Sequence, residues 1–403
     1  MARRLLRNSA VKLQLTKTKT VELSLPSFGG GSRQKGDVTG VELSSGRAEG
    51  CPAVRICRKK DGWHLAAAGF VPPPDGEMPT CWDEISRQPS WELPRQFQAS
   101  GAALAVSSPA ASFGQSSAEA IVQEMMRGEG AAPSASASPA AGNRRLAIKR
   151  AAPAAPQRPV EAQPRRRPEF PAEGEPVSEN GRRFVVRPFA EEGFHISASI
   201  PEYQALWLGR LLPEGRRPTA CSIQLAESAL MASVSLQPEF AERGGSAVAM
   251  MFRDDAVFFA GYKKGVPALW RRCPGFHGYT AMREAVKKTL GVGDDLVDSV
   301  LEESLVDPRP ALEPLMHPVM EQLELARAYL SGKHGLDVDR VILLGLPCGA
   351  VHWKRYAEET LHIQLVAPGP FEGLVVDKDA ETAAPHVFLT ALGAALAAAE
   401  AAK

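Results

Sequence analysis

The chain has 403 residues, which is enough for two or three domains with sizeable hydrophobic cores. Its hydrophobic content is 44% and its formal net charge is only +1, so overall charge argues neither for a nucleic-acid partner nor for an acidic substrate. The apolar runs are too short to cross a bilayer, no secretion signal is visible, and the six cysteines lack CxxC spacing, so we expect a cytosolic protein with reduced thiols.

The N-terminal stretch alternates basic and apolar residues and then passes through three consecutive glycines, Gly29 to Gly31. This pattern predicts a flexible basic tail over residues 1–36, strand-like or loose, ahead of a joint. Its basic residues could touch anionic lipid. Because no amphipathic helix of useful length accompanies them, a solvated tail is the preferred interpretation.

Three strands are expected after this tail. The first follows Val38, and residues 53–72 read as two more strands that turn at Asp61 and Gly62, since an Asp-Gly pair is a strong hairpin signal. A short strand and a helix follow over residues 101–126, with Ser117 as the helix N-cap.

Residues 127–182 consist mainly of Ala, Pro, Ser, Arg and Glu. With so few branched or aromatic residues the stretch cannot bury enough apolar surface to offset the entropy of ordering, so we predict a long disordered loop. Its arginines lack the interleaved aromatic residues that stack on bases, which favours a spacer over a nucleic-acid site. Strand, helix, strand and helix patterns follow from Phe184 and predict a small α+β module.

The second half predicts a meander of three strands over residues 247–271, then two helices over 280–306, and a longer helix over 313–333 that ends at Gly335. Residues 337–368 then give a buried strand, a turn rich in glycine over 345–349, a helix and another strand. In a parallel sheet such a turn could present backbone N–H groups to a nucleotide. It could equally be a plain tight turn, and on these residues alone the plain turn is preferred.

The order of these elements resembles the actin-like ATPase superfamily, and within it most closely the PilM and FtsA type. The resemblance rests on the run from Gly40 to Ser45 followed by Val71 and Pro72, on the later meander with Arg271 or Arg272, and on the turn at 344–350. It implies an α/β, actin-like (ribonuclease H-like) two-domain fold with a small α+β inserted subdomain. The implied parts are the tail (1–36), a first subdomain (37–100), the inserted subdomain with its loop (101–222), a second domain (223–385) and a C-terminal helix that packs back on the first subdomain (386–403).

The same resemblance implies a nucleotide cleft for ATP with Mg²⁺. The contacts carried over to this chain are Glu42 at the position of a metal-contacting aspartate, Ser44 and Ser45 in the first phosphate turn, Gly275 in the second phosphate region, and Gly345 and Gly349 in the adenosine motif. The chain departs from the family at several of these places. Ser44 adds a Cβ where a phosphate should approach, Met251, Phe252 and Arg253 stand where the family has Asp-Ile-Gly, and Pro347 removes a backbone donor. We therefore assign no catalytic residue and no metal ligand, and leave ATP binding open.

The function that this resemblance implies is a cytoplasmic scaffold of a type IV pilus or type II secretion platform, peripheral to the inner membrane. Such a scaffold binds the short cytoplasmic N-terminal segment of a single-span, PilN-like membrane protein, in a groove between the first and inserted subdomains. Weak or lost ATP hydrolysis and self-association would both be compatible with that role. Two alternatives stay open: a working ATPase switch in which Glu42 holds Mg²⁺ through water, and an FtsA-like cell-division protein, which ranks last because the Ala-rich C-terminal helix is weakly amphipathic.

Overall fold

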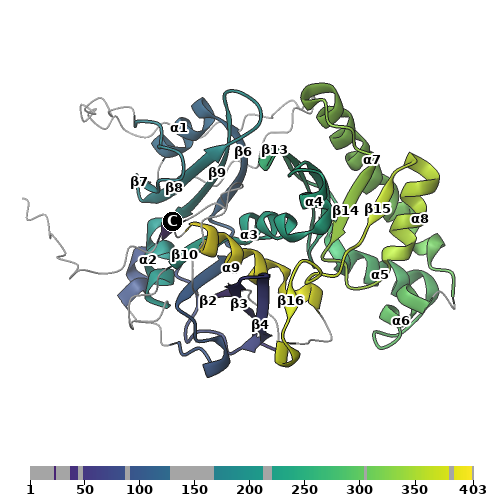
Figure 1. Ribbon diagram of the computed structural model, residues 1–403, viewed down its shortest axis with the longest axis horizontal. Helices are drawn as coiled ribbons and strands as arrows, with labels where there is room; N and C mark the ends of the chain where they lie inside the picture. Colours follow the sequence, from purple (N-terminus) through teal and green to yellow (C-terminus); the bar gives the residue numbers. More distant parts are fainter. Residues whose placement is uncertain are drawn as a thin grey trace, which may run out of the picture.

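The computed structural model describes residues 22–23, 37–43, 49–86, 91–127, 168–211, 220–303, 306–380 and 385–401. Within these ranges three β-sheets organise the chain, and helices cover the sheets on both sides (Figure 1).

The first sheet contains seven strands in the spatial order β1-β10-β5-β2-β3-β4-β16. In that order they are β1 (Glu22–Leu23), β10 (Ala220–Leu225), β5 (Gly101–Val106), β2 (Asp37–Leu43), β3 (Cys51–Lys59), β4 (Gly62–Val71) and β16 (Val375–Val376). Strands β2, β3 and β4 form an antiparallel meander, whereas β5, β10 and β1 run parallel to β2. The hairpin predicted at Asp61 and Gly62 is confirmed, because β3 and β4 pair up to Lys59 and Gly62.

The second sheet contains five strands in the order β13-β12-β11-β14-β15. They are β13 (Val266–Arg272), β12 (Val257–Lys263), β11 (Ala247–Phe252), β14 (Arg340–Leu344) and β15 (Gln364–Val366). Again three strands form an antiparallel meander and two more run parallel to its first strand. With β1 and β16 set aside, both sheets order their strands as third, second, first, fourth and fifth. This repeated unit confirms the expected two-domain fold of the actin-like, ribonuclease H-like type.

A third sheet, in the order β6-β9-β8-β7, forms the inserted α+β unit. Its strands are β6 (Ser112–Ser117), β9 (Phe194–Pro201), β8 (Arg182–Pro188) and β7 (Val177–Glu179), and α1 (Ala118–Arg127) and α2 (Glu202–Leu211) accompany them. The resemblance implied an inserted subdomain over residues 101–222. Strands β5 and β10 lie in the first sheet instead, because β5 pairs with β2 and β10 pairs with β5.

The disorder predicted for residues 127–182 is wrong at the C-terminal end of that range. Residues 168–182 are described, and they include β7, which pairs with β8. Phe170 and Val177 pack against a small buried cluster that contains Met125 and Phe184. These few apolar contacts order the end of the stretch. The prediction missed them because it rested on the average composition, which is dominated by polar and small residues. Residues 128–167, like most of the predicted tail, lie outside the described residues.

The helices of the second domain pack around its sheet (Figure 1). They are α5 (Gly278–Leu290), α6 (Val297–Glu303), α7 (Arg309–His334) and α8 (Ala350–Leu361). Helix α3 (Ala226–Ser233) packs instead against β10 and β5 of the first sheet, and α4 (Pro238–Glu242) follows it in the chain. The long helix predicted over 313–333 begins earlier, at Arg309, and ends as expected at Gly335, whose φ of 65° is the left-handed conformation that closes many helices.

Helix α9 (Leu389–Ala401) returns to the first sheet and lies against β2, β3, β5 and α3. The approach is close enough to need glycine on both sides. A Cβ on Gly40 would fall against the backbone of Ala391, and a Cβ on Gly393 would fall against the carbonyl oxygen of Ala229. The Ala-rich helix α9 therefore packs closely against β2 on one side and against α3 on another.

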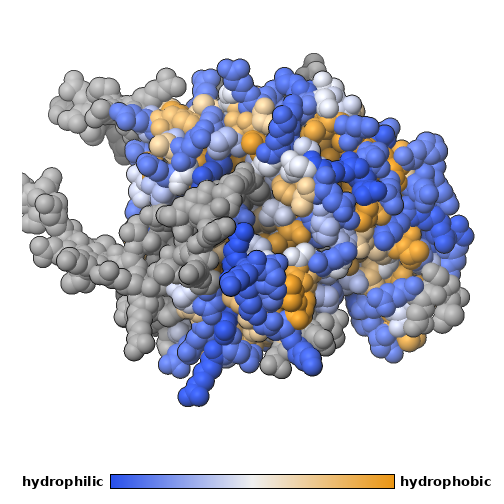
Figure 2. Space-filling view, viewed as in Figure 1, coloured by the Kyte–Doolittle hydropathy of each residue, from blue (hydrophilic) through white to orange (hydrophobic). Residues whose placement is uncertain are grey.

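The face drawn in Figure 2 is mostly hydrophilic, with hydrophobic residues in separate patches. The large apolar side chains that are exposed include Trp82, Leu296, Leu325 and Val375, which lie far apart in the sequence. Among the helices of the described residues, none combines the length and apolarity needed to cross a bilayer.

Candidate functional site

The two domains meet where β2 and β5 of the first sheet and β11 of the second end. Glu42 is the penultimate residue of β2, Ser107 follows β5, and Arg253 follows β11. Nη2 of Arg253 lies 3.7 Å from Oε1 of Glu42 and donates a hydrogen bond to the Ser107 hydroxyl at 3.1 Å. One side chain of the second domain thus bridges the ends of two strands of the first.

The Glu42 end of this bridge is shielded from water, whereas Ser107 is exposed. The side chain of Glu42 is 5% exposed and that of Arg253 is 17% exposed. Nε of Arg253 also lies 3.8 Å from the exposed carboxylate of Asp255. At the position where the family would place a metal-contacting carboxylate, this chain places a carboxylate next to a guanidinium. A Mg²⁺ ion there would face that positive charge at short range, so these residues do not fit a metal.

The beginning of α5 packs against the turn that joins β11 to β12. The N–H groups of Tyr279 and Thr280 donate to the carbonyl oxygens of Arg253 and Asp254, at 3.0 and 3.1 Å. Gly278, with φ at 60°, has no room for a Cβ against the same backbone. Free N–H groups in the first turn of a helix are what a phosphate binds. Here two of them are used inside the protein.

The turn after β14 is also filled from within. Gly345 has φ at 75°, and a Cβ on it would fall against the carbonyl oxygen of Phe252, at the end of β11. Gly349, with φ at 80°, is the N-cap of α8. Between them the thiol of Cys348 is buried and hydrogen-bonded to the hydroxyl of Tyr279. The glycines therefore have structural reasons to be present that involve no nucleotide.

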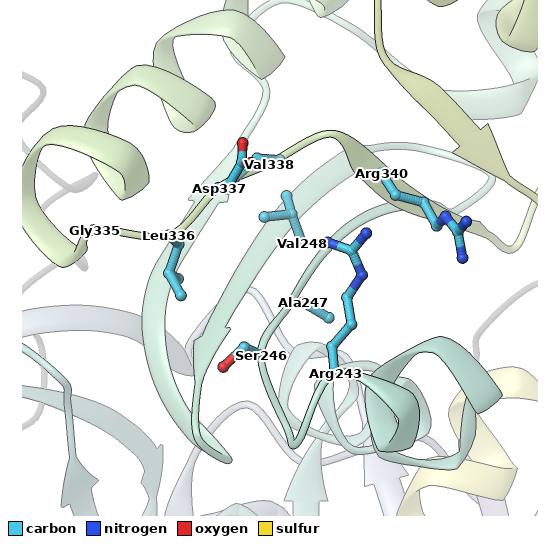
Figure 3. A pocket seen from close by; sticks show the side chains of 9 residues that line it. All are labelled: Arg243, Ser246, Ala247, Val248, Gly335, Leu336, Asp337, Val338 and Arg340. Carbon is cyan, nitrogen blue, oxygen red and sulfur yellow. The ribbon is translucent and has the colours of Figure 1, made fainter.

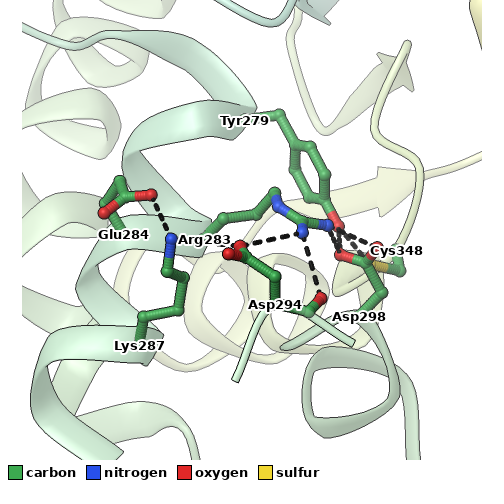
Figure 4. Close-up of polar contacts among 7 residues, drawn as sticks. All are labelled: Tyr279, Arg283, Glu284, Lys287, Asp294, Asp298 and Cys348. Carbon is green, nitrogen blue, oxygen red and sulfur yellow. Dashed lines mark hydrogen bonds and ion pairs between the residues drawn. The ribbon is translucent and has the colours of Figure 1, made fainter. Parts of the chain in front are cut away.

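A polar network extends from this thiol along α5 (Figure 4). The Tyr279 hydroxyl donates to Oδ1 of Asp298 at 2.7 Å, and the guanidinium of Arg283 pairs with the same carboxylate. Lys287 continues the chain to Asp294 at 3.0 Å. Burial raises the pKa of the Cys348 thiol to about 11, and burial together with these hydrogen bonds raises the pKa of Tyr279 above its usual value. Both groups stay protonated at neutral pH and act as hydrogen-bonding groups rather than nucleophiles.

The sequence of this chain matches no family model and no curated protein. Among solved structures, the chain is similar to a protein of the "PilM-PilN type IV pilus biogenesis complex", with a TM-score of 0.50 and 16% identity over 89% of this chain and 97% of that one. The fold is the actin-like one.

Two further solved structures align with lower TM-scores. A Bacteroides thetaiotaomicron protein of unknown function with an actin-like ATPase fold gives 0.36 at 9% identity, over 88% of this chain and 95% of that one. The ethanolamine utilization protein EutJ from Carboxydothermus hydrogenoformans gives 0.29 at 10% identity, over 48% of this chain and 60% of that one.

The residues that the sequence predicts for the nucleotide cleft lie in different places in the structure. Glu42, Gly345 and Gly349 lie on or beside the turns just described, and Gly275 lies in an open turn ahead of α5, with φ at 73° and no atom within 4 Å of a Cβ. Ser44 and Ser45 lie outside the described residues. Met251 is fully buried in the core, so it cannot act in the cleft.

Sequence reasoning missed the bridging role of Arg253 and the partners Tyr279 and Asp298. A signal for the first was present, since an arginine directly follows the fully apolar strand β11. No local pattern indicated that it would reach Glu42 in the other domain. In the described ranges no group of three or more His, Cys, Asp or Glu side chains could hold a metal ion.

A pocket of about 220 Å³ opens at the other end of the second sheet (Figure 3). Its lining includes Ala247 and Arg340, which begin β11 and β14, and Arg243, which pairs with Asp339 at 2.7 Å. The pocket is thus at the amino-terminal ends of these strands, away from Glu42 and Arg253. Ligands of parallel α/β sheets usually bind at the carboxyl ends, so this pocket is a weaker candidate than the domain junction.

Proposed function

We propose that this protein is a cytoplasmic scaffold of the PilM kind in a type IV pilus or type II secretion platform, and that it does not depend on ATP hydrolysis. The observation that carries the proposal is the bridge from Arg253 to Glu42 and Ser107. This bridge joins the two domains through the carboxylate of Glu42, which stands where an actin-like ATPase would have its metal-contacting aspartate. The similarity to a PilM-PilN complex chain, which spans nearly the whole length of both chains, supports the same role.

The junction favours a scaffold on physical grounds. An ATPase of this fold must leave donors and a carboxylate available for a charged ligand and must bring a nucleophilic water to it. In this chain the amides of Tyr279 and Thr280, the carboxylate of Glu42 and the thiol of Cys348 all have partners inside the protein. A junction closed in this way suits a fixed arrangement of two domains.

The proposed partner is the short cytoplasmic segment of a single-span, PilN-like inner-membrane protein. Attachment to the membrane would then be indirect, through that partner. The proposed place is between the first sheet and the inserted unit. Support comes from α2, which lies against both β10 and β8 and so lines both sides of that boundary.

Two measurements test the proposal. In calorimetry, a synthetic peptide of the partner's cytoplasmic N-terminal segment should bind, and a shuffled peptide should not. In a thermal melt, millimolar MgATP should leave the melting temperature unchanged, because we expect no useful affinity for the nucleotide. A ligand whose Kd is ten times its concentration adds only about 0.06 kcal/mol to the unfolding free energy.

The opposite result is equally clear. A rise in melting temperature of several degrees with MgATP, together with hydrolysis that is lost in Glu42→Ala, would contradict the proposal and support the alternative of a working ATPase. Failure of the partner peptide to bind, with no MgATP effect, would remove the pilus role and leave only the fold.

A further inference from the structure

The outer edge of the first sheet is formed by a very short strand. Strand β10 pairs along all six of its residues with β5; on its other side, within the part of the chain that the structure describes, Ser222 and Ile223 pair with Glu22 and Leu23 of β1. Strand β1 comes from the N-terminal part of the chain and runs parallel to β10. The edge of β10 is thus covered in one small place by a remote segment of the same chain.

The covered place lies between two structural units. Strand β1 lies against β8 of the inserted sheet as well as against β10, and α2 also contacts both. Ser222 and Ile223 are buried. An extended segment in this position therefore contacts the first domain and the inserted unit at the same time.

The connection allows this pairing within one chain. Leu23 is level with Ile223, Leu104 and Val41 in the register, so it lies three strand spacings from β2, roughly 14 Å. From Val41 the chain must go back four residues to Asp37, roughly 13 Å more along the strand direction, which gives a straight distance of about 20 Å. The thirteen residues 24–36 can span up to about 43 Å. The segment can therefore leave the edge and return without disturbing β2.

The segment has the chemistry of a peptide that adds a strand to a sheet. In the sequence, Val21, Leu23 and Leu25 alternate with polar residues, and Pro26 follows. Alternation with period two is the strand pattern, and proline ends pairing because it lacks an N–H donor. Exposed strand edges are templates for such pairing, and main-chain hydrogen bonds then supply much of the affinity.

We infer that the edge of β10 facing β8 is a peptide-binding edge that this chain fills with its own segment around Glu22 and Leu23. A second extended segment with alternating apolar and polar residues can pair there only after the chain's own segment has left. Occupation in cis is independent of any partner. The identity of the competitor, a PilN-like segment, rests on the proposed function.

The test uses hydrogen exchange and a labelled peptide. Deletion of residues 1–28 removes β1, and deletion of residues 1–17 is the matched control that keeps it. We expect amide exchange over residues 220–225 to become roughly threefold faster after the longer deletion and to stay unchanged after the shorter one. A fluorescent peptide of residues 17–28 should bind the longer deletion roughly threefold more tightly than the full chain, and should restore protection at 220–225.

Proline variants keep the test decisive if a deletion folds poorly. Glu22→Pro and Leu23→Pro in the full chain should open the edge to the same peptide, and the peptide carrying both prolines should not bind. Equal peptide binding to the full chain and to both deletions, or unchanged exchange at 220–225, would overturn the inference. If the self-peptide binds as expected and a PilN-like peptide does not compete with it, the occupied edge stands and the proposed partner fails.

Discussion

The polar groups at the domain junction are paired within the fold, whereas the outer edge of β10 is paired over a short stretch. At the junction, the guanidinium of Arg253, the amides of Tyr279 and Thr280 and the thiol of Cys348 are all bonded to other parts of the fold. At the edge, the described residues pair with β10 over two positions, through a strand that precedes β2 by thirteen residues. The domain junction is thus held by polar contacts within the protein, whereas the edge of β10 is where we propose exchangeable pairing.

The largest effect should come from Gly345. The substitution Gly345→Ala forces a left-handed φ on alanine and places a Cβ against the carbonyl oxygen of Phe252, so we expect a loss of about 3 to 5 kcal/mol of unfolding free energy. Gly275→Ala is the matched control, because its φ is 73° but nothing lies within 4 Å, and it should cost only about 1 kcal/mol. Denaturant melts measure both. Equal costs would mean that the junction is not tightly closed.

Removal of the interdomain bridge should have the next largest effect. We expect Arg253→Ala to cost about 2 to 3 kcal/mol, because it leaves the buried carboxylate of Glu42 without this partner. The control Arg243→Ala breaks a shorter but more exposed pair with Asp339, at 2.7 Å, and should cost less than about 1 kcal/mol. A double-mutant cycle with Glu42→Gln isolates the coupling. A coupling energy near zero would show that the bridge does not join the domains.

The network under the turn after β14 should contribute less. Tyr279→Phe removes the hydroxyl that bonds Asp298 and Cys348, while Arg283 still pairs with Asp298, so the expected loss is about 1 kcal/mol. Tyr356→Phe is the control, since its hydroxyl makes a longer contact of 3.3 Å to His317 in an exposed place. Chemical denaturation of the pair should separate them. An unchanged stability in Tyr279→Phe would argue that this part of the cleft is not closed by its side chains.

The smallest effect on stability is expected at the outer edge. Leu23→Pro should lower the unfolding free energy by less than about 0.5 kcal/mol, because two paired residues gain little over the entropy of ordering them. The same change at Leu104, in the middle of β5 and paired on both sides, should prevent folding. A loss of several kcal/mol in Leu23→Pro would show that β1 is part of the core structure and would erase the contrast with the junction.

Much of the fold could be predicted from local patterns in the sequence. The hairpin at Asp61 and Gly62, the apolar run of β14 and the helix end at Gly335 each follow from a few adjacent residues. The resemblance added the order of the domains. The assignment of β5 to the first sheet could not be predicted in this way, because it depends on pairing with β2 and β10 rather than on its own sequence.

The candidate site was predictable in location more than in chemistry. Glu42 lies beside Arg253 of the other domain and Gly345 lies against the end of β11, while their predicted contact with a nucleotide stays a prediction. Glu42 contacts Arg253, and Gly345 lies against the carbonyl oxygen of Phe252. In each pair the two residues are far apart in the sequence. The first contact forms only when the two domains come together, and the second only when β11 and β14 pair in the second sheet, so no single stretch of sequence carries the signal.

The position of α9 has a consequence for synthesis of the protein. This helix covers the face formed by β2, β3 and β5, yet it is translated after the whole second domain. At a ribosomal rate of roughly 5 to 20 residues per second, about 350 residues separate Gly40 from its contact at Ala391, a delay of roughly 20 to 70 seconds. During that interval the nascent first domain carries an uncovered apolar sheet face, which makes it a natural client for a chaperone that acts during translation.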